Sequence, residues 1–338
     1  MILQTVWFIL VTVLFIGFFF LEGFDYGVGI LLPFLGKKDE ERRAILNTIG
    51  PIWDSNEVWM ITAGGAMFAS FPHVYATLFS GFYLALFLML VALIARGLGL
   101  EFRSKVESKA WRSFWDWAIF GGSLAPALLW GVAVGNLMRG FAIEADMNYY
   151  GGLLPLLNPF SILAGLVFVS LFTMHGANFL KLKAPEVIAK RADKVGFVAW
   201  IVATVLTVAF VVWTFFATDI LTKDGINGLI PAALAAVALL ATGFLGKAGK
   251  DKWAFVTGSL TVAFATIMVF AGLFPRILIS SLNPEWSLTI TNASSSPYTL
   301  KIMTIVVCIF LPFVLAYLIW TFWVFRKRVT AEKKDLIY

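Results

Sequence analysis

The 338-residue chain is poor in charged residues, cysteine and histidine. Only 14% of the residues are charged, about half the fraction usual in soluble domains. The single cysteine, Cys308, excludes an intrachain disulfide and a CxxC metal or redox site. Two histidines, His73 and His175, leave few axial ligands for haem iron. These shortages exclude a soluble globular protein and a disulfide scaffold.

Apolar residues, by contrast, make up 60% of the chain and gather in long runs. A bilayer-spanning helix takes about 20 such residues. Nine runs are candidates: 6–34, 52–69, 74–95, 115–137, 160–180, 195–217, 228–245, 253–274 and 300–325. The second carries acids and the seventh is short, so these two need independent support. Because no basic residue precedes Lys37, the first run is expected to be a retained span and not a signal peptide.

Successive connections between the apolar runs are alternately rich and poor in lysine and arginine. This alternation supports all nine spans. Rich connections and the C-terminal segment hold 22 of the 26 basic residues, and the four connections between them hold 4. The positive-inside rule then predicts an outside N-terminus and a cytoplasmic C-terminus. Segment 37–43 (KKDEERR) reads as a solvated cytoplasmic loop, and Arg96, Glu101 and Arg103 as the start of a second one. Because the basic residues are divided among separate segments, no nucleic-acid site is predicted.

We therefore predict an all-α integral membrane protein with about nine transmembrane helices. Residues 1–338 are expected to form a single transmembrane domain. Its possible halves are two four-helix bundles, 1–140 and 155–275, with 299–325 as one peripheral helix. Glycines inside the spans, such as Gly23, Gly27, Gly29 and the Gly64–Gly65 pair, favour close helix packing over phosphate binding.

Four carboxylates inside the spans are the strongest functional candidates, because ionisable groups are costly there. Glu22 and Asp25 lie in the first span, and Asp54 and Glu57 in the second. Each pair is spaced i, i+3 and so shares a helix face. With the predicted topology, all four lie in the cytoplasmic half. No lysine or arginine within these two spans neutralises them, so burial and repulsion would favour proton exchange near pH 7. Alternatively, Asp54 caps its helix and Glu57 faces headgroup water.

The histidines do not indicate a haem site. His73 follows the second span on the outer side, whereas His175 lies near the inner end of the fifth. The two cannot bracket one haem in this topology. Ordinary hydrogen-bonding or interfacial roles are expected for both, and no metal site is predicted.

Several segments of the chain carry specific motifs. The most specific is the W-D-x-N-x-V-W core within PIWDSNEVWMITAGGAMFASFP (51–72). The others are GFDYGVGI (23–30), FSGFYLALFL (79–88), FRSKVESKAWRSFWDWAIFGGSLAP (102–126), GVAVGNLMRG (131–140), LLNPFSILAGL (156–166) and WAFVTGSLT (253–261). With these motifs the chain resembles subunit II of the cytochrome bd-type quinol oxidases. The similarity covers essentially the whole chain and is strongest in the first 170 residues.

The resemblance implies a subunit of a complex in the bacterial cytoplasmic membrane that oxidises quinol and reduces dioxygen to water. Haem b and haem d would belong to a larger partner, subunit I, in a heterodimer. A small single-helix subunit is compatible with it, and membrane lipids surround the complex. Asp54 and Asp25 match acids of a proton path from the cytoplasm, Glu22 stands where some members carry a different acid, and Glu57 where others have an uncharged residue. Trp53 would contact a quinone held as a structural lipid.

Two other functions remain open from the sequence alone. Intramembrane acids and glycine-interrupted helices are also typical of proton-coupled secondary transporters. A purely structural subunit, whose acids are satisfied internally, is the third hypothesis. In the favoured hypothesis the chain is catalytic only with its partner.

Overall fold

The computed structural model describes residues 1–330 and is almost entirely helical. In this part of the chain, eight helices are long and apolar enough to cross a membrane. They are α1 (Ile2–Leu35), α5 (Tyr83–Phe102), α6 (Lys109–Arg139), α7 (Pro159–Lys183), α8 (Glu186–Ala217), α9 (Leu229–Lys247), α10 (Asp251–Leu273) and α11 (Pro297–Val324). The prediction of an all-α membrane protein is confirmed.

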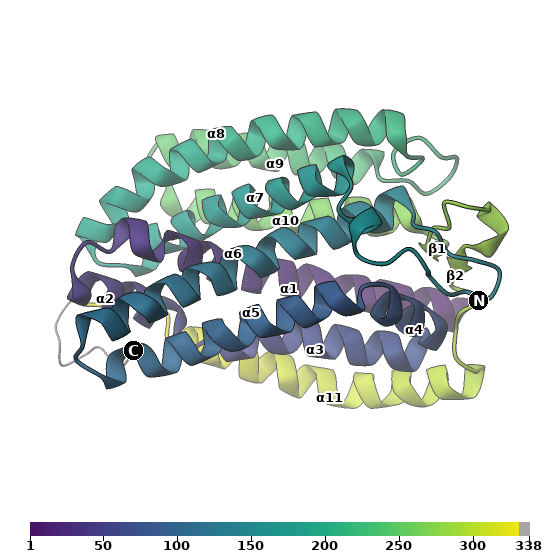
Figure 1. Cartoon of the computed structure of the whole chain (residues 1–338), viewed down its shortest axis with the longest axis horizontal. Helices are drawn as coiled ribbons and strands as arrows, with labels where there is room; N and C mark the ends of the chain where they lie inside the picture. The colour runs from purple at the N-terminus through teal and green to yellow at the C-terminus, as the bar shows by residue number, and fades with distance from the viewer. Residues whose placement is uncertain (331–338) are drawn as a thin grey trace.

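The remaining predicted span is α3 (Trp53–Ser70), which lies along the same axis between α5 and α11 (Figure 1). It carries Asp54, Asn56 and Glu57 and is not among the eight apolar helices. Whether it crosses the membrane remains a prediction. Nine crossings are supported by the positions of the first and last helices: α1 begins and α11 ends at opposite ends of the molecule (Figure 1). Such an arrangement requires an odd number of crossings, so α3 would be the ninth.

The helices form two groups around α1. Helices α3, α5 and α6 accompany α1 on one side, while α7, α8, α9 and α10 pack together on the other (Figure 1). Helix α11 packs on the outer side of this arrangement, mainly against α1 and α3. This arrangement supports the proposed two four-helix halves and a peripheral helix, although α1 and α7 also cross closely. At that crossing an added Cβ on Gly27 would lie 1.9 Å from the Phe172 carbonyl oxygen, so the glycine is needed there.

The third predicted span, 74–95, is wrong in its bounds. The chain forms a short helix, α4 (Pro72–Gly81), turns at Phe82 and continues as α5. Helix α5 extends to Phe102 because the apolar run continues beyond Arg96 as Gly97-Leu98-Gly99-Leu100. The short 3₁₀ turn η1 (Arg103–Lys105) follows it.

Segment 37–43 is also not a solvated loop. It belongs mostly to helix α2 (Asp39–Ile49), whose later residues Ala44, Ile45 and Leu46 are fully buried. The charged residues at its start face other charged groups, as described below. Figure 1 places α2 and the α5–α6, α7–α8 and α9–α10 connections at one end of the molecule. These are the basic connections of the sequence.

The opposite end holds short irregular elements. A two-stranded antiparallel sheet pairs β1 (Arg276–Leu278) with β2 (Leu288–Thr289), with the 3₁₀ turn η3 (Pro284–Trp286) between them. A further 3₁₀ turn, η2 (Leu154–Leu156), precedes α7. Helix α7 then begins at Asn158, whose side chain accepts from the Ser161 amide while Pro159 occupies the first turn. The predicted cytoplasmic C-terminus, in 331–338, lies outside the described residues.

Candidate functional site

A buried cluster of charged side chains joins α1, α3 and α5. Arg96 on α5 is fully buried and pairs with Glu22 on α1 and with Glu57 on α3. The Arg96 Nη1 lies 2.7 Å from Glu57 Oε1. The guanidinium also lies over the Tyr26 ring, with Cζ 4.9 Å from its centroid, a cation–π geometry. One cation thus ties together three helices that are distant in sequence.

Asp25 lies beside this cluster in a different setting. Its Oδ2 accepts a hydrogen bond of 2.7 Å from Asn56 Nδ2 on α3, and both residues are fully buried. Its Oδ1 is buried and has no hydrogen-bond partner among the described residues. Asp25 is therefore held by an uncharged donor, whereas Glu22 and Glu57 are held by a cation.

The four predicted acids form a gradient of exposure. Asp54, in the first turn of α3, is exposed. Glu57, one turn further along the same face, has 23% of its side chain accessible, and Glu22 has none. The structure thus brings Glu22, Asp25 and Glu57 together and places Asp54 at the accessible edge.

The sequence analysis was wrong about Arg96. It assigned Arg96 to a cytoplasmic loop and expected no cation near the acids. The run from Tyr83 to Leu100 is apolar on both sides of Arg96, and this could have indicated an intramembrane arginine. Asn56 was likewise not predicted as a partner of Asp25.

The charge balance of the cluster decides what it can do chemically. Glu22, Asp25 and Glu57 lie together with only one cation, Arg96, which pairs with the two glutamates, so the fully ionised cluster carries two excess negative charges. Uncompensated charge is costly in a buried site. The cluster can therefore accept two protons before it becomes neutral, a property that a proton relay requires.

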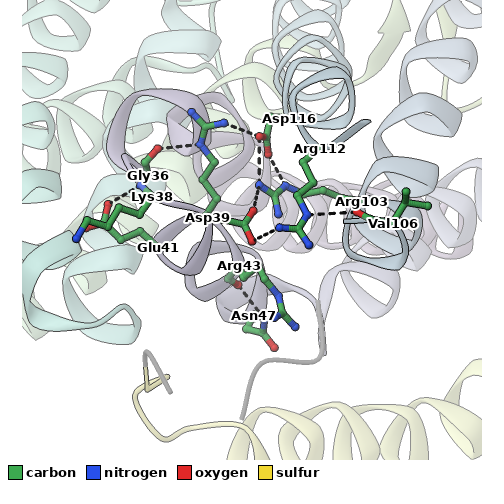
Figure 2. Close-up of polar contacts among 11 residues, drawn as sticks. Gly36, Lys38, Asp39, Glu41, Arg43, Asn47, Arg103, Val106, Arg112 and Asp116 are labelled. Carbon is green, nitrogen blue, oxygen red and sulfur yellow. Dashed lines mark hydrogen bonds and ion pairs between the residues drawn. The ribbon is translucent and has the colours of Figure 1, made fainter. Parts of the chain in front are cut away.

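A second charged network closes the end of this helix group. Asp116 on α6 accepts from Arg103 and from Arg42 of α2, whose Nη1 lies 2.6 Å from Asp116 Oδ2. Asp39 on α2 pairs with Arg103 at 3.0 Å and with Arg112 at 2.9 Å. Figure 2 shows Asp39 and Asp116 lying next to Arg103, with Arg112 close to Asp39.

This network corrects the predicted roles of Arg103 and the α2 segment. Arg103 is buried and lies two helical turns beyond Arg96, about 10 Å along the helix axis. The positive-inside rule does not by itself account for a buried arginine that pairs with Asp116 of α6 and Asp39 of α2. The network fastens α2 against the junction of α5 and α6, near the exposed edge of the acidic cluster.

Glu41 links α2 to the second helix group. Its carboxylate pairs with Arg191 of α8 at 2.7 and 3.0 Å and accepts from the Lys37 amide. The Arg191 hydrogen bonds lower the pKa of Glu41 from 4.5 to about 2. A carboxyl group whose pKa is lowered by folding stabilises the fold at pH values above its ordinary pKa. This contribution is lost as the pH falls from 4.5 towards 2.

We expect Glu41→Gln to lower the stability of the assembled complex by about 1 kcal/mol at pH 7, because the pair is partly exposed. The difference from the unmodified protein should shrink as pH falls below 4. Thermal unfolding at pH 7 and pH 3 measures both, with exposed Glu107→Gln as the control. An equal difference at both pH values would contradict the assignment.

The two histidines lie in different environments. His73 is exposed near the start of α4, and His175 is fully buried in α7. Within residues 1–330, no group of three or more histidine, cysteine or acidic side chains could hold a metal ion. The two histidines also come from distant helices, so they do not form a joint site.

Trp53 lies at the start of α3, half-buried and facing α5, where an added Cβ on Gly97 would be 3.3 Å from its ring. A large cavity of about 610 Å³ lies elsewhere, between the two helix groups, and is lined mainly by leucine, phenylalanine and valine side chains. Trp53 is not part of its lining. The Trp53 ring and the cavity lining are thus two separate apolar surfaces inside the helical structure.

The fold and the cluster define a multi-pass helical membrane protein with a buried acidic site open at one edge. Comparison with known proteins is specific: residues 3–325 match the family model for cytochrome bd terminal oxidase subunit II. The chain is 42% identical to cytochrome bd ubiquinol oxidase subunit 2 of Bacillus subtilis, with 99% of both chains covered. It is 39% identical to cytochrome bd-I ubiquinol oxidase subunit 2 of Escherichia coli K12, covering 98% of this chain and 96% of the relative.

The chain belongs to the cytochrome bd terminal oxidase subunit II family. It is thus a subunit of an oxidoreductase complex that contains haem and a partner subunit I. Its fold matches a bd oxidase structure from Geobacillus thermodenitrificans with a TM-score of 0.77, at 16% identity, over 96% of this chain and 97% of that one. At this identity the structural match supports the fold alone.

Proposed function

We propose that this chain supplies a proton-uptake path to a quinol:oxygen oxidoreductase whose redox chemistry takes place in subunit I. The observation that carries the proposal is the exposure gradient from Asp54 through Glu57 to the buried cluster around Arg96. Protons would enter at Asp54 and pass to the carboxyl groups of Glu57, Glu22 and Asp25. Reduction of dioxygen to water consumes protons, so such a path would serve the reaction directly.

Haem b and haem d would be held by subunit I in a heterodimer with this chain, with dioxygen and quinol reaching the complex from the membrane. The relatives' names include ubiquinol, which supports a quinol as electron donor. A small single-helix subunit could complete the assembly. Within this chain, we assign no residue to haem ligation.

We further propose that the complex lies in a bacterial cytoplasmic membrane with the N-terminus outside. The support is that the basic connections gather at one end of the helices, with α2 (Figure 1). Asp54 lies towards this same end, close to the start of α3. The proposed proton entry therefore faces the cytoplasm.

A bound quinone remains a proposal with two structural options. A ring contact at Trp53 would place it beside Gly97 of α5. The apolar cavity of about 610 Å³ could instead hold a hydrophobic chain. Extraction of the purified complex, followed by quinone analysis of Trp53→Ala, separates these: loss of quinone supports contact at Trp53, and retention supports the cavity.

Asp54→Asn tests the proton path at its entrance. We expect quinol-oxidase turnover to fall about 10-fold, less than the roughly 10²–10⁴-fold contributed by a positioned acid or base, because water can replace part of the role of an exposed group. The haem spectrum of the complex should survive, because Asp54 is exposed and makes no contact needed for packing. Glu101→Gln, an exposed acid near the end of α5, is the matched control. Unchanged turnover in an assembled variant would contradict the role, and loss of haem would indicate a role in assembly.

The proton-coupled transporter is the alternative function, because it also needs buried acids. Proton uptake by vesicles containing the complex, measured with and without quinol, distinguishes it. A transporter takes up protons without quinol, whereas the proposed path works only during turnover. A structural subunit would retain full uptake after replacement of its carboxylates.

A further inference from the structure

A pocket lined by both polar and apolar side chains lies in the second helix group, away from the acidic cluster. It has a volume of about 400 Å³ and lies between α7, α8 and α9. At its mouth Lys181 is 95% buried and bonds Asp193 at 2.6 Å and Asp251 of α10 at 2.7 Å. Other polar side chains in its lining are Asn178, Lys194, Thr242 and Lys247. These groups make the pocket wettable, and none of them belongs to the proposed proton path.

His175 lies outside the pocket lining but shares two neighbouring residues with it. Asn178 and Thr242 line the pocket and also border Gly258 of α10. An added Cβ on Gly258 would lie 3.4 Å from His175 Nδ1 and 3.8 Å from Asn178 Nδ2. The glycine therefore leaves a small space that His175, Asn178 and Thr242 share.

The hydrogen bonding of His175 leaves one nitrogen unsatisfied. Its Nε2 lies 3.2 Å from the Phe20 carbonyl oxygen of α1, and its ring stacks on Phe255 at 4.8 Å. A carbonyl oxygen only accepts, so Nε2 carries the proton and Nδ1 is a bare acceptor. Nδ1 is buried without a partner in the described part of the chain. A buried acceptor without a protein partner is a setting in which proteins hold ordered water.

We propose that the pocket between α7, α8 and α9 is a water-filled inlet from the basic end of the molecule. Through this inlet His175 exchanges protons with bulk water. A proton carried by this water adds to the Nδ1 lone pair, and Nε2 keeps its hydrogen bond to Phe20. The reverse step returns the proton to water. The charged groups facing this route are Lys181 of α7, Asp193 and Lys194 of α8, Lys247 of α9 and Asp251 of α10, while α1 presents Phe20 and Phe24.

Exchange of the histidine C2 hydrogen with deuterated water tests the inlet in the intact complex, because the rate depends on water access and protonation. Peptide mass spectrometry resolves His175 from His73, which is exposed and serves as the internal reference. We expect His175 to exchange with a pH-dependent rate. Asn178→Leu, which fills the inlet with an apolar side chain, should slow His175 several-fold and leave His73 unchanged. Absence of exchange at His175 across the pH range would overturn the proposal.

Cysteine accessibility supplies a second test that does not depend on His175 itself. In a Cys308→Ser background, Asn178→Cys should react with a charged methanethiosulfonate reagent added at the basic end. Ala177→Cys is the matched control, since Ala177 is fully buried and outside the pocket lining. Equal protection of both cysteines would contradict a water-filled inlet. Neither test uses the acidic cluster. A failure of the inlet proposal can therefore be distinguished from a failure of the proposed proton path.

Discussion

Arg96→Gln is expected to prevent stable assembly or to lower the stability of the complex by about 3–5 kcal/mol. Removing the guanidinium leaves Glu22 and Glu57 in the interior without their cation. The cost arises mainly from these buried carboxylates and less from the lost contact with Tyr26. Yield of the haem-containing complex and its thermal unfolding temperature measure the effect.

A double variant separates charge from packing. Glu22→Gln combined with Arg96→Gln removes one carboxylate together with the cation, so part of the stability should return. Lys105→Gln, an exposed basic residue in the η1 turn, is the control and should have little effect. If Arg96→Gln alone were as stable as the control, the three-helix ion cluster would not be a structural unit of this protein.

The sequence predicted the helices more accurately than the contacts between them. Apolar runs and basic connections identify spans because hydrocarbon and surface charge act on each segment separately. The break at Phe82 was missed because the sequence is apolar and uncharged on both sides of it. The continuation of α5 past Arg96 was missed because a charged residue ends a run in a hydropathy scan. The partner of that charge lies on α1, 74 residues earlier, and no local pattern contains it.

The same limit applies to the candidate site. The i, i+3 spacing put Glu22 and Asp25 on one face of α1. The structure shows both fully buried and brings Glu57 to Glu22 through Arg96. The amide partner of Asp25 was missed because asparagine in a helix carries no distinctive signal. Helix α2 was missed because its first turns are charged, and its apolar face begins only at Ala44.

Asp25→Asn is expected to reduce quinol-oxidase turnover by about 100-fold or more, if the proton path runs through the cluster. The replacement is nearly isosteric, and the new carboxamide oxygen can still accept from Asn56 Nδ2. The fold and the haem spectrum should therefore survive while the group loses its ability to carry a proton. Turnover with a soluble quinol, together with the optical spectrum, gives both readouts.

The matched control is Asn56→Leu, which removes the hydrogen bond but keeps the carboxyl group of Asp25. If proton transfer is the role of Asp25, Asn56→Leu should retain more turnover than Asp25→Asn, even though it disturbs the packing of α3 more. If the role is structural, the order should reverse, because the isosteric variant preserves the contact that the control destroys. The order of these two rates thus distinguishes a relay from a scaffold within a single pair of residues.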